Sequence, residues 1–313
     1  MSETPLWFEQ GIAEPGEHGT VEVAGVTIHF ETWGERSRPG IILIHGSNAH
    51  RHWWRFVAPF LADQFRVAAL DLSGNGDSGH RERYDGETFA AEVWAVCQEA
   101  LGPRPFVIGH SFGGFVALET AHRYGADMGG VIFNDFTVRS PKEYVEWGMR
   151  AKREGRTKPR QLRVYPEFDT ALGRFRLMPE QPVRYPEVIR WLGQHSLKEV
   201  DGGWTWKFDP GLFDHIEMGR QQFEKFAGLQ CRSAVVLGEH SADGGAQSAP
   251  FMREVTRDLM PIFSVPNTHH HMMFEDPIAL TMAFKGLVLS WLAQDGQQDL
   301  KTALAEAAKA HEH

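Results

Sequence analysis

The sequence predicts an α/β fold: a doubly wound, mostly parallel, eight-stranded sheet interrupted by one inserted helical cap. Two observations carry this prediction. Short continuous apolar runs, typical of strands buried on both faces, recur along the chain, and helical patterns separate most of them. One interval of about ninety residues is too long for a simple crossover or for a structureless loop, which indicates an insertion. A chain of 313 residues is long enough for one large domain with such an insertion.

The predicted strands begin with a hairpin that turns at Ala24-Gly25 and joins residues 21–23 to residues 26–32. The buried strands follow at residues 40–45, 66–71, 105–108, 131–133, 233–237 and 262–265. Helices are predicted at residues 53–64, 87–101, 112–124, 251–259 and 277–293, with a terminal helix over 298–313. Strand and helix alternate, which favours parallel pairing in the sheet.

The long interval divides the chain into a core, residues 1–136 and 226–313, and a helical cap, residues 137–225. The cap holds a basic run from Arg150 to Arg163, typical of a solvated helix face but also able to attract an anionic substrate. It also holds tryptophans that fit either ordinary packing or an aromatic pocket: Trp147, Trp191, Trp204 and Trp206.

Composition limits the classes of partner. A net charge of −9 gives no global basic field for nucleic acid. Cys97 and Cys231 each lie in or beside an apolar segment, which favours two buried thiols and a reducing compartment. The first residues lack the pattern of a secretion signal, and the apolar runs are too short to span a membrane. We expect a cytoplasmic protein that binds neither nucleic acid nor membrane, and a homodimer is left open.

The most informative motif is Gly109-His110-Ser111-Phe112-Gly113, which lies between a predicted strand and a predicted helix. This arrangement is typical of a nucleophile elbow, a strained turn that presents a serine hydroxyl above the sheet. Small residues at 109 and 113 let strand and helix approach each other closely. The helix N-terminus beside Ser111 favours developing negative charge. Ser111 is therefore the candidate nucleophile.

With the elbow, the sheet and the insertion in place, the chain resembles the α/β hydrolases, in their capped, single-domain, esterase-like form. The resemblance covers nearly the whole chain. It rests on the elbow, on His45-Gly46-Ser47 after the third strand, on the segment from Asp71 to Gly79 after the fourth, and on the segment from His270 to Pro277. The order nucleophile, acid, histidine is also that of this family.

The histidine of the catalytic triad has to be chosen from three neighbours, His269, His270 and His271. In relatives the base lies seven residues before the proline that opens the last large helix, and counting back from Pro277 gives His270. His269 and His271 are the alternatives. Adjacent histidines on one loop rarely face one metal ion, and no partners stand at ligand spacing, so no metal site is predicted.

The acid of the triad departs from the commonest pattern. In most relatives an aspartate stands three residues after the glycine that ends the seventh strand, and here that place is taken by Ser241. Some relatives carry the acid directly after the sixth strand, which favours Asp135. Asp243 is the alternative acid, and Glu239 is a third candidate.

The resemblance also implies an oxyanion hole formed by the backbone amides of Ser47 and Phe112. Asn48, Trp54 and His110 are the predicted substrate-binding residues. The glycine-rich segments lack the spacing of a phosphate-binding loop, and no cofactor is implied.

A serine nucleophile predicts an acyl-enzyme that water then cleaves. The expected reaction is hydrolysis of a carboxylic ester, thioester or lactone of a small to medium, partly apolar substrate. Relatives that open epoxides or remove halogen use an aspartate at the elbow, which argues against those reactions. Hydrolysis of a carbon–carbon bond in ring-cleavage products is the alternative enzyme activity, because those relatives share the triad. A ligand receptor with slow or no turnover is the alternative from another class.

Overall fold

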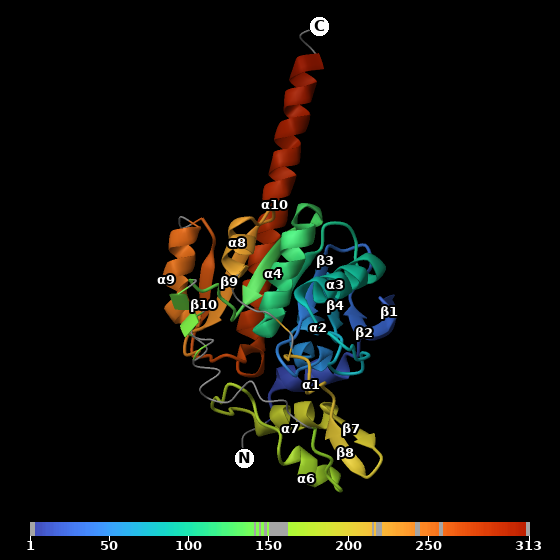
Figure 1. Ribbon diagram of the computed structural model, residues 1–313. Helices are drawn as coiled ribbons and strands as arrows, with labels where there is room; N and C mark the ends of the chain where they lie inside the picture. Colours follow the sequence, from blue (N-terminus) through green and yellow to red (C-terminus); the bar gives the residue numbers. More distant parts are fainter. Residues whose placement is uncertain are drawn as a thin grey trace.

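An eight-stranded sheet forms the centre of the computed structural model, in the order β1-β2-β4-β3-β5-β6-β9-β10 (Figure 1). The structure describes residues 4–140, 162–214, 221–241, 245–256 and 259–310, together with residues 142, 143, 145, 146, 149 and 216. The strands are β1 Glu17–Val23, β2 Val26–Trp33, β3 Gly40–Ile44, β4 Arg66–Leu70, β5 Phe106–His110, β6 Gly130–Asn134, β9 Ser233–Gly238 and β10 Ile262–Val265. Within this sheet, β2 pairs in antiparallel fashion with β1 and with β4, and the other described pairs are parallel. The predicted fold class is confirmed.

Helices cover both faces of the sheet. The described helices are α1 Leu6–Ala13, α2 Ala58–Leu61, α3 Gly86–Ala100, α4 Phe112–Tyr124, α6 Phe168–Leu172, α7 Pro186–His195, α8 Gln222–Ala227, α9 Gly245–Val255 and α10 Pro277–Ala310. One core cluster joins the sheet to α3, α4, α8 and α9, and a second joins it to α1, α2 and α10. The central strands are buried on both faces, as their continuous apolar runs predicted.

Several helices differ from the prediction. The helix expected over 53–64 is a 3-10 turn, Arg51–Trp54, followed by the short α2. Pro59 lies in the first turn of α2, and because proline lacks an amide proton it starts a helix more readily than it continues one. Helix α9 begins and ends earlier than expected, and α1 was not predicted. Helix α10 joins two predicted helices, since Gly296 does not interrupt it.

In its described residues, the insertion between β6 and β9 is less helical than predicted. Besides α6 and α7 it contains an antiparallel hairpin of β7 Leu197–Val200 and β8 Gly203–Trp206. Residues 162–214, here named the cap segment, form a separate layer at the end of the molecule opposite the projecting end of α10 (Figure 1). Trp204 and Trp206 contact Phe168 and Phe175 within this layer. These tryptophans pack inside the cap segment, while Trp147 and most of the basic run lie outside the described residues.

Polar contacts join the cap segment to loops that follow the carboxyl ends of core strands. Lys207 Nζ lies 2.7 Å from Asp77 Oδ1. The Nε2–H of His50 donates to Ser196 Oγ at 2.8 Å, because the hydroxyl proton of Ser196 is already donated to the carbonyl of Leu192. These contacts hold the cap segment over the edge of the sheet at which β3, β4 and β5 end.

Helix α10 packs on the sheet with its first half and extends past the body with its second half (Figure 1). Its stretch Pro277–Gly296 is long and apolar enough to cross a membrane by length and composition, and this is the single such helix among the described residues. Phe284, Val288 and Trp291 belong to the core, which is the pattern of a core helix in a globular protein.

Candidate active site

The turn at Ser111 has the geometry of a strained elbow. Ser111 lies between β5 and α4 with φ 55° and ψ −118°. A Cβ atom on Gly109 would lie 2.0 Å from the carbonyl oxygen of Gly113, and one on Gly113 would lie 2.5 Å from that of Ile44. Glycine is required at both positions because the backbone of α4 approaches β3 and β5 so closely.

Strain recurs at the ends of the neighbouring strands. Asn48, Ser111 and Asp135 follow β3, β5 and β6, and their φ angles are 54°, 55° and 48°. Positive φ is unfavourable for residues with a side chain, and such residues cluster at functional sites. The Ser111 amide donates to the carbonyl of Asn134 at 3.0 Å, which ties two of these strand ends together.

Each of the three adjacent histidines has a different partner. His270 Nδ1 lies 2.5 Å from Asp135 Oδ2, and both side chains are buried. The amide and Nδ1–H of His269 donate to the carboxylate of Glu275, at 2.6 and 2.8 Å. The amide and Nδ1–H of His271 both donate to Gln181 Oε1, at 2.8 Å each. Of the three, His270 is the one brought to a candidate acid.

Asp135 accepts hydrogen bonds on both carboxylate oxygens. The Gly238 amide donates to Oδ1 at 3.0 Å, and the Ser241 hydroxyl donates to Oδ2 at 2.5 Å. Asp243, the alternative acid, lies outside the described residues. Glu239 accepts instead from the amide of Asn267 at 2.8 Å on the exposed side of the β9 turn.

His110 and Trp54 lie beneath the loop that carries His270. The Nε2–H of His110 donates to the carbonyl of His270 at 2.9 Å, and burial lowers the pKa of His110 well below 6.5, which keeps the ring neutral. Trp54 is fully buried and contacts the rings of His110 and Phe284. Neither side chain has surface for a substrate in this structure, so their assignment to substrate binding stays a prediction that this burial does not support.

The loop after β3 lies against the elbow. A Cβ on Gly46 would lie 3.4 Å from Ser111 Cβ. The Nδ1–H of His45 donates to the Gly46 carbonyl at 2.8 Å, while His45 Nε2 accepts from the amide of Leu72 at 3.1 Å. These bonds fix the ring and the backbone that leads to Ser47, whose side chain is exposed. The amide of Phe112 is in the first turn of α4, where amide groups have no partner within the helix.

A buried ion network supports the same loop. Asp71 is fully buried and accepts from both the amide and the guanidinium of Arg51. Arg51 also lies 2.9 Å from Asp77, which in turn binds Lys207 of the cap segment. The segment from Asp71 to Asp77 thus has structural contacts, and it links the loop after β3 to the cap segment.

Sequence reasoning missed two contacts at this site, that of Ser241 with Asp135 and that of Gln181 with His271. Ser241 had a signal, since it stands where most relatives carry the acid. Gln181 had none, because it comes from the cap segment, far from His271 in sequence.

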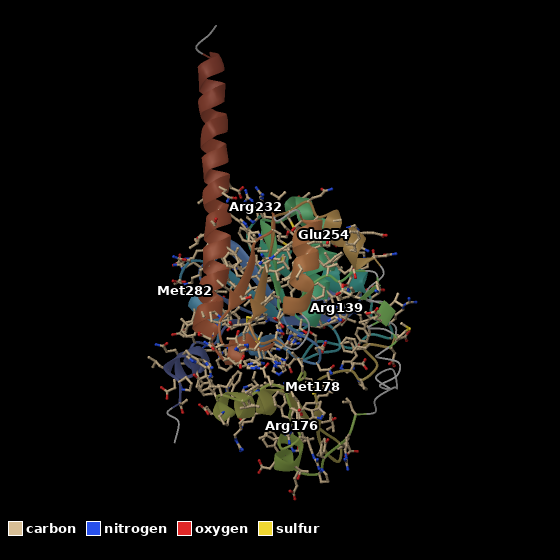
Figure 2. The ribbon with its side chains drawn as sticks, turned by 90° about the vertical axis from the view of Figure 1, so that its left-hand side faces the viewer. Arg139, Arg176, Met178, Arg232, Glu254 and Met282 are labelled. Atoms are coloured by element: carbon tan, nitrogen blue, oxygen red, sulfur yellow. The ribbon has the colours of Figure 1, made fainter. Side chains whose placement is uncertain are left out.

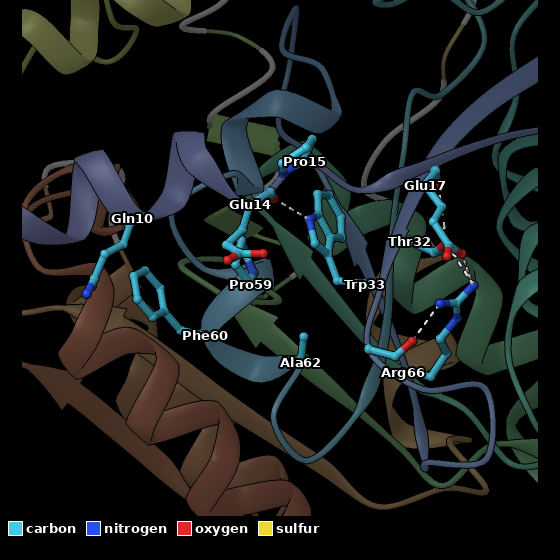
Figure 3. Close-up of a pocket in the computed structure, with 11 residues that line it drawn as sticks. Gln10, Glu14, Pro15, Glu17, Thr32, Trp33, Pro59, Phe60, Ala62 and Arg66 are labelled. Atoms are coloured by element: carbon cyan, nitrogen blue, oxygen red, sulfur yellow. Dashed lines mark hydrogen bonds and ion pairs between the residues drawn. The ribbon is translucent and has the colours of Figure 1, made fainter.

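Three hollows lie away from Ser111. One of about 480 Å³ is lined by Gln10, Glu14, Trp33 and Arg66, and Figure 3 shows Trp33 bound to the Glu14 carbonyl. Arg66 opens β4, so this hollow is at the amino end of the strands. Two others, of about 560 and 460 Å³, share Phe175, Arg176 and Ile189 of the cap segment. Figure 2 shows Arg176 on this layer, at the opposite end of the body from Arg232.

The part of the chain that the structure describes contains neither a metal-binding cluster nor a reactive thiol. No group of three or more His, Cys, Asp or Glu side chains there is arranged to hold a metal ion. Cys97 and Cys231 are free thiols, and burial raises the pKa of Cys231 to about 11, which keeps it protonated at neutral pH.

Comparison with known proteins identifies hydrolases of this fold. The model of the alpha/beta hydrolase family matches residues 41–283. An esterase of Mycobacterium tuberculosis is 24% identical over 268 residues, which are 82% of this chain and 84% of that protein. Mouse epoxide hydrolase 4 is 29% identical over 140 residues, 43% of this chain but only 38% of that protein.

Solved structures agree in fold. E-2-(acetamidomethylene)succinate hydrolase has a TM-score of 0.72 at 19% identity, covering 87% of this chain and 98% of that one. The thioesterase domain from the curacin biosynthetic pathway has a TM-score of 0.71 at 23% identity, covering 88% and 100%. From the elbow, the sheet order and the family match over most of its length, the chain belongs to the α/β-hydrolase family.

Proposed function

We propose that this protein is a serine hydrolase that cleaves a carboxylic ester, thioester or lactone through an acyl-enzyme on Ser111. The observation that carries the proposal is the buried contact of 2.5 Å between His270 Nδ1 and Asp135 Oδ2. A carboxylate at Nδ1 fixes the imidazole tautomer, so that Nε2 carries the lone pair and can act as a general base. Among the residues that the structure describes, Asp135 is the carboxylate that lies against His270.

The chemistry follows from this tautomer. Nε2 of His270 takes the hydroxyl proton of Ser111 while Oγ attacks the substrate carbonyl, and Asp135 stabilises the imidazolium that forms. The amides of Ser47 and Phe112 stabilise the oxyanion of the tetrahedral intermediate. His270 returns the proton to the leaving alcohol, and the same groups then activate water to release the acid.

The substrate class is inferred from the nucleophile and supported by relatives. The esterase of Mycobacterium tuberculosis aligns over most of both chains. A pimeloyl-[acyl-carrier protein] methyl ester esterase of Nitrosospira multiformis is 25% identical over 254 residues, 78% of this chain and 92% of that one. Both names support ester chemistry. The serine at the elbow argues against epoxide opening, which on this scaffold begins with an aspartate.

The decisive experiment is labelling with a fluorophosphonate probe, which forms a bond to an activated serine. We expect the wild-type protein to be labelled and Ser111→Ala to remain unlabelled, with equal folding by circular dichroism. A p-nitrophenyl ester series assayed beside a vinylogous diketo acid then separates ester from carbon–carbon hydrolysis. Absence of labelling in the wild-type protein would refute the serine hydrolase and favour a ligand receptor.

A further inference from the structure

The turn after β9 brings a serine to the buried acid. Ser241 Oγ lies 2.5 Å from Asp135 Oδ2, the same oxygen that lies 2.5 Å from His270 Nδ1. Both the serine hydroxyl and the imidazole N–H therefore donate to one carboxylate oxygen. Gly238 donates its amide to the other oxygen, Oδ1.

The backbone holds Ser241 in place independently of Asp135. The Ser241 amide donates to the carbonyl of Gly238 at 3.1 Å, and the His240 amide donates to that of Thr268 at 2.8 Å. A Cβ on Gly238 would lie 2.2 Å from the carbonyl oxygen of His269, so the turn lies directly against the histidine loop. The hydroxyl is thus presented by a turn that is fixed to the same loop as the histidine.

Two hydrogen bonds restrict the orientation of the Asp135 carboxylate more than one hydrogen bond would. With the Gly238 amide alone, the carboxylate could rotate about its bond to Cβ and move Oδ2 away from the imidazole. A hydrogen bond to Oδ2 from a second, fixed direction opposes this rotation, and charge-assisted hydrogen bonds are among the stronger ones. Asp135 also has a φ of 48°, a strained backbone conformation that persists only when surrounding contacts hold it. The hydrogen bonds to its carboxylate are among these contacts.

We infer that Ser241 is a positioning residue, which holds Oδ2 of Asp135 in line with His270 Nδ1. This inference rests on the proposed function of Ser111, His270 and Asp135. In this role Ser241 acts through the carboxylate of Asp135.

A double-mutant cycle tests the inference. Ser241→Ala should lower kcat by about tenfold to a hundredfold with little change in KM, because the interaction orients the base and does not bind substrate. In an Asp135→Asn background the same substitution should cost at most a small further factor. Ser241→Thr, which keeps the hydroxyl, should retain most of the activity. Ser264→Ala, at an exposed serine of β10, is the matched control.

Two results would overturn the inference: wild-type kcat in Ser241→Ala, or an equal loss from Ser241→Ala in both backgrounds. A measurement that does not depend on catalysis can separate failure of this inference from failure of the proposed function. The low-field proton signal of His270 Nδ1–H, assigned by its loss in His270→Gln, should shift in Ser241→Ala and stay in place in Ser264→Ala. A shift in a protein that no probe labels would uphold the role of Ser241 and reject only the hydrolase.

Discussion

His270 and Asp135 meet at 2.5 Å although they lie 135 residues apart, and the carboxylate comes from the end of β6 instead of the turn after β9. In this arrangement Asp135 follows a strand adjacent to the one that leads to Ser111, since β5 and β6 are paired. The proposed nucleophile and the proposed acid are therefore fixed by one pair of parallel strands, and the proposed histidine is brought by a loop.

Replacing the acid should remove most of the activity. Asp135→Asn keeps the shape of the side chain but no longer stabilises the imidazolium, and we expect kcat to fall by about 10⁴-fold with little change in melting temperature. Steady-state kinetics on a p-nitrophenyl ester measures this. Glu239→Gln, on the same edge of the sheet, serves as the control and should stay near wild type. Near-normal turnover in Asp135→Asn, together with an inactive Asp243→Asn, would move the acid to Asp243.

The contact between Gln181 and His271 should couple the cap segment to the histidine loop. Gln181→Ala leaves the buried amide and Nδ1–H of His271 without their acceptor, at a cost of about 1–3 kcal/mol. Native-state hydrogen exchange at the His271 amide should then quicken by about tenfold or more, with a lower kcat. Glu180→Ala changes the exposed neighbour and should leave the exchange unaltered. Unchanged exchange in Gln181→Ala would show that the loop holds its shape without the cap segment.

The buried ion network should be sensitive to loss of its cation. Arg51→Met leaves the fully buried Asp71 without its guanidinium partner, and breaking such a pair costs about 3–5 kcal/mol. Arg232 forms a comparable pair with Asp295, but those side chains are 33% and 30% exposed, so Arg232→Met should cost no more than about 1 kcal/mol. Urea unfolding of both variants measures the difference. Equal losses would mean that burial does not decide the strength of the pair.

Acidification should destabilise the protein through its neutral, buried histidines. Burial lowers the pKa of His50, His110 and His271 well below 6.5. Below about pH 6.5 the unfolded chain takes up protons that the folded protein does not, so stability is fully present above this pH and declines below it. The loss is at most about 1.4 kcal/mol per pH unit for each group.

A variant isolates this effect from other groups. Burial raises the pKa of Glu31 and Glu92, which acts in the opposite direction, so the difference between two proteins is the useful quantity. His50→Gln retains a donor for Ser196 and should flatten the fall in urea midpoint between pH 7 and pH 5. His122→Gln, at an exposed site, should leave the slope as in the wild type, and an unaltered slope in His50→Gln would contradict the prediction.

The sequence predicted the sheet and the elbow because both depend on local patterns. Continuous apolar runs mark strands buried on both faces, and the elbow is recognised from residue types that stand next to one another in the chain. Gly109 is required by the nearby carbonyl of Gly113, although Gly113 itself is required by the remote carbonyl of Ile44. Pattern alone could not distinguish the helix pair around Pro59 from one helix, nor the hairpin Leu197–Trp206 from helical structure. Both depend on what these short segments pack against.

The candidate site was less predictable than the sheet, because its contacts depend on segments that are remote in the sequence. The choice of His270 rests on its distance from Pro277, where α10 begins. The acid could only be favoured as Asp135, with Asp243 and Glu239 left open, because a carboxylate on either of two adjacent strand ends can reach the same imidazole. Two contacts form only when remote segments meet: that of Ser241 with Asp135 and that of Gln181 with His271. No spacing in the sequence predicts either of them.

At Asn48, Ser111 and Asp135, which have positive φ angles, selection for thermostability and selection for activity favour different residues. Glycine would relax the backbone at each of these places, so a search for thermostable variants alone would tend to accept it. At two of them it would also delete the proposed nucleophile or its acid. These three positions are therefore where directed evolution for thermostability alone would first lose activity. Each round of such a selection has to include an activity assay.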